Sequence, residues 1–261
     1  MKKKINSQLI LGLGISFALI ACNQNDKKEE QAKATDTTVN ATTETVQPVA
    51  QENAMDAVKV APGLYKLVSD TLGIRILEIN YKPGDSSAMH SHPDNVLYVI
   101  QGGTGEFTGK DGTKNASELK TGMMAVRSAE AHSVKNTGKT TLKAILVEVS
   151  RPNETISQDA AMGATKIAPD LYKSKNDTLG IRVLEATYKP GQSSAMHSHP
   201  DLVLYVINGG TAEFTGKDGT KNVSELKSGM MAVRPAEAHS VKNTGKTTIK
   251  VLLVEVNRPM K

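Results

Sequence analysis

Two segments of the chain, residues 73–103 (GIRILEINYKPGDSSAMHSHPDNVLYVIQGG) and 180–210 (GIRVLEATYKPGQSSAMHSHPDLVLYVINGG), are nearly identical. The likeness continues on both sides of them at a constant offset of 107 residues, the distance from His90 to His197. A repeat of this length indicates two tandem domains rather than a solenoid of small units. We place the two domains at residues 51–157 and 158–261.

Each copy is made of short β-rich runs separated by turn residues. In the first copy the runs are residues 73–81, 96–100, 106–108, 123–127 and 142–149. Between two of them, Asp111-Gly112 is typical of a tight hairpin. Aromatic residues make up only 3% of the chain and tryptophan is absent. Short strands at this spacing predict an all-β sandwich or barrel in each half.

The histidines fall at the same places in both copies and nowhere else in the chain. In a strand, residues i and i+2 point to the same face, so the two histidines of each His-Ser-His project together. A third histidine follows 40 residues later (His92 to His132), and a barrel can bring it beside the pair. Three neutral imidazoles suit a divalent transition metal. The predicted ligands are His90, His92, His132, His197, His199 and His239.

The glycines and histidines together resemble the two motifs of the cupin family. The matching residues of the first copy are Gly84, His90, His92 and Gly102, then Gly122, His132 and Asn136; those of the second are Gly191, His197, His199 and Gly209, then Gly229, Pro235, His239 and Asn243. The resemblance covers nearly all of residues 60–150 and 167–257. It implies a double-stranded β-helix, a small jelly-roll barrel, in each half: a bicupin. It also implies one divalent transition metal (Fe, Zn, Mn, Ni or Cu) in each barrel.

The sequence departs from the cupin pattern at two places that bear on the site. The glutamate that usually completes the cupin metal site is replaced by Asn95 in one copy and Leu202 in the other. We therefore expect no fourth ligand there, and a first site that differs from the second. In the loop before the last histidine, a glutamate (Glu130, Glu237) stands where cupins usually have glycine. It is a candidate fourth ligand, catalytic acid or base, or partner of a ligand imidazole; a solvated side chain is the alternative.

Three histidines leave coordination positions open for water and for a small molecule. This arrangement is compatible with zinc acting on a bound water or with iron(II) binding dioxygen. The resemblance to cupins implies the second as a candidate, because some three-histidine cupins act as dioxygenases. The alternative is a barrel that binds a small ligand or a metal without catalysis. The fold does not choose between these classes, so the sequence leaves open whether the protein is an enzyme.

The N-terminal segment has the pattern of an export signal. Three lysines precede an apolar run from Leu9 to Ile20, which is too short for a comfortable membrane span. It ends in Leu19-Ile20-Ala21-Cys22, which resembles a bacterial lipobox and implies lipidation of Cys22. We expect a signal peptide at residues 1–21, a flexible polar tether at residues 22–50, and a lipid-anchored protein of the bacterial cell envelope.

The charge distribution argues against a nucleic-acid-binding protein, and the cysteine content excludes a disulfide-bonded fold. The formal net charge is +5, but three of the positive charges belong to Lys2, Lys3 and Lys4 in the predicted signal. The remaining lysines alternate with acidic residues, so no clustered basic face predicts a nucleic-acid partner. Because Cys22 is the only cysteine, a disulfide within the chain is impossible.

Overall fold

The structure, a computed structural model, describes residues 55–156 and 161–260. The described residues of both repeats belong to one compact unit of the chain. The predicted signal peptide, the tether and Cys22 lie outside the described residues. Among the described residues, no helix is long and apolar enough to span a membrane.

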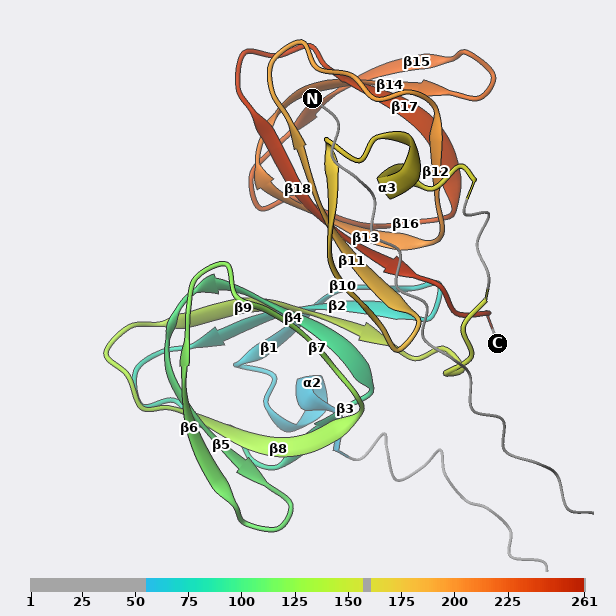
Figure 1. Cartoon of the computed structure of the whole chain (residues 1–261). Helices are drawn as coiled ribbons and strands as arrows, with labels where there is room; N and C mark the ends of the chain where they lie inside the picture. Colours follow the sequence, from blue (N-terminus) through green and yellow to red (C-terminus); the bar gives the residue numbers. More distant parts are fainter. Residues whose placement is uncertain (1–54, 157–160, 261) are drawn as a thin grey trace, which may run out of the picture. The chain divides into compact units, whose positions relative to one another are not determined.

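The first repeat folds into a barrel of two antiparallel sheets that face each other (Figure 1). One sheet has the order β1-β2-β9-β4-β7 and the other β3-β8-β5-β6, and the short helix α2 lies against β1 and β3. The elements are α2 (Ala57–Val60), β1 (Tyr65–Thr71), β2 (Ile74–Tyr81), β3 (His90–His92), β4 (Asp94–Gln101), β5 (Gly103–Gly109), β6 (Lys114–Leu119), β7 (Met124–Arg127), β8 (Glu130–Asn136) and β9 (Leu142–Val149).

The second repeat has the same topology, with sheets β10-β11-β18-β13-β16 and β12-β17-β14-β15. Its elements are α3 (Ala164–Ile167), β10 (Tyr172–Thr178), β11 (Ile181–Tyr188), β12 (His197–His199), β13 (Leu202–Asn208), β14 (Gly210–Gly216), β15 (Lys221–Leu226), β16 (Met231–Arg234), β17 (Glu237–Asn243) and β18 (Ile249–Val256). The fold is the predicted all-β pair of jelly-roll barrels. Every strand run expected in the first copy is confirmed, with β1, β3, β6 and β8 in addition.

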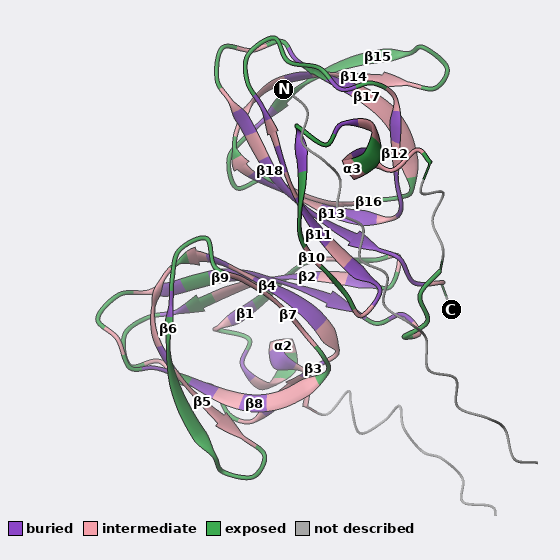
Figure 2. Ribbon diagram, viewed as in Figure 1, coloured by how far each residue is buried: buried purple, intermediate pink, exposed green. Residues whose placement is uncertain are grey.

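The central strands of the two larger sheets, β9 and β18, are buried along almost their whole length, whereas β6 and β15 are largely exposed (Figure 2). On β9 alternate residues such as Leu142, Ala144 and Leu146 fill the interior of the first barrel. Their neighbours Ile145 and Val147 join an apolar cluster with Val254 and other residues of the second barrel. This double burial explains why β9 and β18 are almost continuous apolar runs.

One cupin glycine is required by packing and another by backbone conformation. Gly84 has φ 87° in the turn that follows β2, a left-handed value that other residues adopt only with strain. At Gly102 a Cβ atom would collide with the carbonyl oxygen of Leu119. These two positions fix the turn before the His-Ser-His strand and the end of β4.

Two arginines reach from one repeat to the other, and each binds the aspartate two residues after a His-Ser-His. Arg151 comes just after β9 and donates to Asp201 at 2.5 Å; Arg258 comes just after β18 and donates to Asp94 at 2.5 Å. Each aspartate also accepts a backbone N–H, from Ala129 in the first barrel, through its other carboxylate oxygen. Each repeat therefore helps to position the histidine loop of the other.

We predict that Arg258→Ala lowers the free energy of unfolding by about 3 kcal/mol, because it removes a buried guanidinium and leaves the carboxylate of Asp94, only 12% exposed, without its charged partner. Chemical denaturation measures this loss. The control is Lys66→Ala, which removes an exposed ion pair with Glu78 and should cost less than about 1 kcal/mol. Equal losses in the two variants would contradict a structural role for the crossed arginines.

Candidate metal centres

Three histidines converge inside each barrel, as the sequence predicts. In the first barrel His90 and His92 point the same way from β3, and β8 places His132 directly opposite His90 in the antiparallel register. One ring nitrogen from each of the three lies within 4.8 Å of those of the other two. The ring centroids are 4.9 to 5.3 Å apart. The group His197, His199 and His239 repeats this arrangement in the second barrel.

Each imidazole of the first site has an acceptor close to its Nδ1 atom. Nδ1 of His90 lies 2.8 Å from the carbonyl oxygen of Ala88, and Nδ1 of His92 lies 2.7 Å from the Glu148 carboxylate. In His132 it lies 3.5 Å from the Glu130 carboxylate. In the second barrel the corresponding distances are 2.8, 2.6 and 3.2 Å. A proton held on each Nδ1 leaves the three Nε2 lone pairs free to bind a metal.

The protonation state of the histidines also fits metal binding. Burial, assisted by the charges of the neighbouring histidines, lowers the pKa of His90 and of His197 to about 4. Both imidazoles are therefore neutral at pH 7, the form in which histidine binds a metal. Three imidazoles that converge inside the barrel, each with its Nδ1 atom facing an acceptor, form a donor set that fits a divalent transition metal.

Glu148 and its counterpart Glu255 were not foreseen from the sequence. Glu148 is 1% exposed and binds Nδ1 of His92, while its other oxygen lies 3.1 Å from Arg75. In the second barrel Glu255 binds His199 and Arg182 in the same way. A glutamate inside the apolar run of β9 and β18 is the signal that marks them, because a charge is buried in a strand only when it is paired.

A pair of buried tyrosines reaches the site from the opposite side. The hydroxyl of Tyr65, on β1, lies 2.9 Å from Nε2 of His90, and it accepts a hydrogen bond from the Tyr81 hydroxyl at 3.1 Å. Burial raises the pKa of Tyr65 well above its usual value, so it is a neutral phenol. Tyr172 and Tyr188 repeat the chain in the second barrel. A metal on Nε2 of His90 would displace this hydrogen bond and leave the phenol facing the site.

The loop glutamates lie beside the last histidine of each site. Glu130 contacts Nδ1 of His132 and accepts a hydrogen bond from Arg127 at 3.1 Å. The hydrogen bond from His132 outweighs burial and, with the charge of Arg127, lowers the pKa of Glu130 to about 2. Glu237 has the same partners in the second barrel, and its pKa is also lowered. Of the roles considered, this geometry favours a partner of the imidazole; the fourth-ligand and acid–base roles stay predictions.

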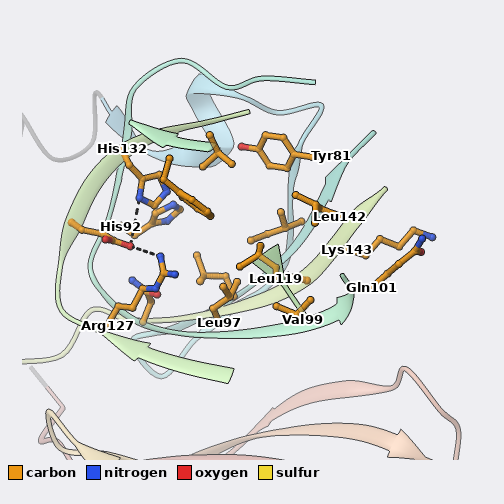
Figure 3. A pocket seen from close by; sticks show the side chains of 17 residues that line it. Tyr81, His92, Leu97, Val99, Gln101, Leu119, Arg127, His132, Leu142 and Lys143 are labelled. Carbon is orange, nitrogen blue, oxygen red and sulfur yellow. Dashed lines mark hydrogen bonds and ion pairs between the residues drawn. The ribbon is translucent and has the colours of Figure 1, made fainter. Parts of the chain in front are cut away.

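A pocket opens from the first site into the barrel, with a volume of about 550 Å³ including its mouth (Figure 3). His92, His132 and Arg127 form its polar end, while Gln101 and Lys143 lie away from the histidines. The walls between them are mostly apolar: Ile79, Leu97, Val99, Phe107, Leu119, Val134, Leu142, Ala144 and Leu146. The pocket therefore has a polar end at the histidines and a mostly apolar body.

Comparison with known proteins establishes the family. The cupin domain family matches residues 77–148 and 184–255, so the chain belongs to the cupin family and is a tandem cupin. No curated protein matches the sequence significantly. The two histidine triads of the described residues fall within these two matched domains. The tyrosines that hydrogen-bond to them, Tyr65 and Tyr172, precede the matched residues.

Three solved structures show the same fold. AerE from Microcystis aeruginosa is 14% identical, with a TM-score of 0.54 over 74% of this chain and 97% of that one. A Bacillus subtilis oxalate decarboxylase is 14% identical, with 0.51 over 72% and 70%. Salicylate 1,2-dioxygenase from Pseudaminobacter salicylatoxidans is 8% identical, with 0.51 over 73% and 76%. At these identities the likeness is one of fold alone.

We predict that Glu148→Gln lowers the affinity of the first site for zinc about tenfold, because the neutral amide orients and polarises His92 less well than the carboxylate. Competition with a chromogenic chelator measures the affinity. Glu118→Gln, a change on the exposed strand β6, is the control and should leave it unchanged. An unchanged affinity in Glu148→Gln would show that the buried carboxylate serves the fold and not the site.

Proposed function

We propose that each barrel binds one divalent transition metal through its three histidines and presents it to a small molecule. The observation that carries the proposal is the convergence of three imidazoles whose Nδ1 atoms each face an acceptor, an arrangement that occurs in both barrels. The likeness to other cupins adds the fold but not the metal.

The residues around the triad define what the site does with a small molecule. A bound divalent metal supplies a Lewis acid for a water or a substrate oxygen. Glu148 and Glu130 hold two of the imidazoles in place, and Arg127 adds a positive charge at the pocket's polar end. The leucine-rich walls exclude water and bind an apolar body.

Two functions fit this site. The first is a metalloenzyme, for which dioxygenase-like chemistry on a small molecule is one candidate because three histidines leave coordination positions open. The second is an envelope protein that binds a small ligand or a metal without catalysis. An enzyme loses turnover with its fold intact when His92 and His199 become alanine; a binding protein loses only its ligand.

We further propose that the protein is anchored to a membrane of the bacterial cell envelope by a lipid on Cys22. The support is the sequence alone: the lipobox-like Leu19-Ile20-Ala21-Cys22 after a basic and apolar start. Metabolic labelling with a radioactive fatty acid should mark the wild-type protein and not Cys22→Ala. Equal labelling of both, or labelling of neither, would contradict the anchor.

The metal proposal is tested by elemental analysis of residues 51–261 purified without a histidine tag. We predict about two equivalents of one transition metal, because two triads are present. The variant His92→Ala with His199→Ala should lose most of it. Lys114→Ala with Lys221→Ala, exposed at matching places of the two repeats, is the control and should retain it. A metal-free protein, even after reconstitution, would overturn the proposal.

A further inference from the structure

The side-chain oxygen of Asn95 is buried without a hydrogen-bond partner at the polar end of the first pocket. Asn95 is 1% exposed and lines the pocket together with His92 and His132. Its Nδ2 atom donates to the carbonyl oxygen of Pro93 at 2.9 Å. Because that carbonyl can only accept, the amide is fixed with its Oδ1 atom on the other side, and Oδ1 has no partner.

The sheet register places this amide oxygen beside the metal-binding residues. Asn95 on β4 is paired with Arg127 on β7 and with Glu148 on β9. Paired residues of antiparallel strands project to the same face, so the amide lies next to the carboxylate that holds His92. Arg127, the neighbouring donor, binds Glu130 instead.

The second repeat shows that the fold does not require this amide. Leu202 occupies the equivalent place, 3% exposed, with the same register against Arg234 and Glu255. A buried amide oxygen without a hydrogen bond destabilises a protein, whereas leucine there does not. The polar group in the first barrel is therefore best explained by a ligand that satisfies it.

We propose that the first barrel recognises a small molecule that carries a hydrogen-bond donor next to its metal-binding oxygen, and that Oδ1 of Asn95 accepts from this donor. The second barrel, with Leu202, takes a molecule without a donor at that place. The inference rests on the proposed metal site and adds the chemical class of its ligand. Asn95 is thus a specificity-determining residue, and the two sites differ in what they bind.

The test compares two probes and two reciprocal variants in the full chain loaded with zinc. Benzohydroxamate binds a metal through two oxygens and carries an N–H donor beside them on an apolar ring; its N-methyl analogue lacks the donor. Calorimetric titration with each probe is run on wild type, Asn95→Leu and Leu202→Asn. Zinc content is measured on the same samples, and thermal unfolding is measured without a probe.

We expect Asn95→Leu to weaken the tighter class of benzohydroxamate sites about tenfold, the loss of one hydrogen bond, and to leave the N-methyl analogue unchanged. Its Tm without a probe should rise by a few degrees, because the unsatisfied oxygen is gone. Leu202→Asn should strengthen benzohydroxamate binding at the second site and lower Tm. A purely structural amide predicts the opposite change in Tm for Asn95→Leu.

Three results would overturn the inference. Equal benzohydroxamate affinities in wild type and Asn95→Leu, or equal losses for both probes, would show that the amide accepts nothing from a ligand. A lower Tm in Asn95→Leu would show that it supports the fold. With two equivalents of zinc present, these results reject the ligand class alone; a protein without zinc rejects the proposed metal site and this inference with it.

Discussion

The hydrogen bond between Glu148 and His92 is the contact on which the first site depends, and Glu255 repeats it with His199 in the second. A carboxylate that is 1% exposed costs several kcal/mol in lost hydration, and it is retained only where charged or polar partners surround it. Arg75, at 3.1 Å, and His92, at 2.7 Å, are these partners. One buried charge therefore determines both the orientation of the imidazole and the position of its strand.

The last strand of each repeat serves both barrels. Three residues beyond Glu148 on β9, Arg151 binds Asp201, which follows the His-Ser-His of the second repeat. Three residues beyond Glu255 on β18, Arg258 binds Asp94 in the same way. These two ion pairs and the two glutamate–histidine hydrogen bonds form a closed circuit, because short backbone segments connect them. The circuit joins the two triads. The tandem cupin is in this respect one unit rather than two independent barrels.

The near identity of the two repeats makes their differences informative. In the first repeat Arg75 binds both Asp56, at 2.6 Å, and Glu148. In the second repeat Gly163 replaces the aspartate, so Arg182 binds Glu255 without that second carboxylate. The replacement of Asn95 by leucine in the second repeat is another difference close to a triad. Both changes alter charge or hydrogen bonding around otherwise matched ligands, which is how duplicated sites acquire different affinities.

The fold and the histidine triads follow from the sequence because their signals are local. Alternating strands, the turn glycines and His-Ser-His lie within 30 residues of one another in each copy, and the family resemblance supplies the third histidine. Tyr65, Glu148 and Arg151 could not be predicted in the same way. Their partners are 25, 56 and 50 residues away, and only the closed barrel and the contact between repeats bring them together. The sequence offers Glu130 as a candidate partner of a ligand imidazole, because it lies two residues before His132; its carboxylate lies 3.5 Å from Nδ1 of His132 on the same strand, β8.

X-ray absorption spectroscopy at the zinc edge of the reconstituted protein tests the central claim most directly, because it reports the atoms bound to the metal. The account predicts three imidazole nitrogens at about 2.0–2.1 Å, with the outer scattering of their rings and an oxygen ligand at the remaining position. A first shell of oxygen alone, without the outer scattering of imidazole rings, would show that the metal lies elsewhere and would contradict the account.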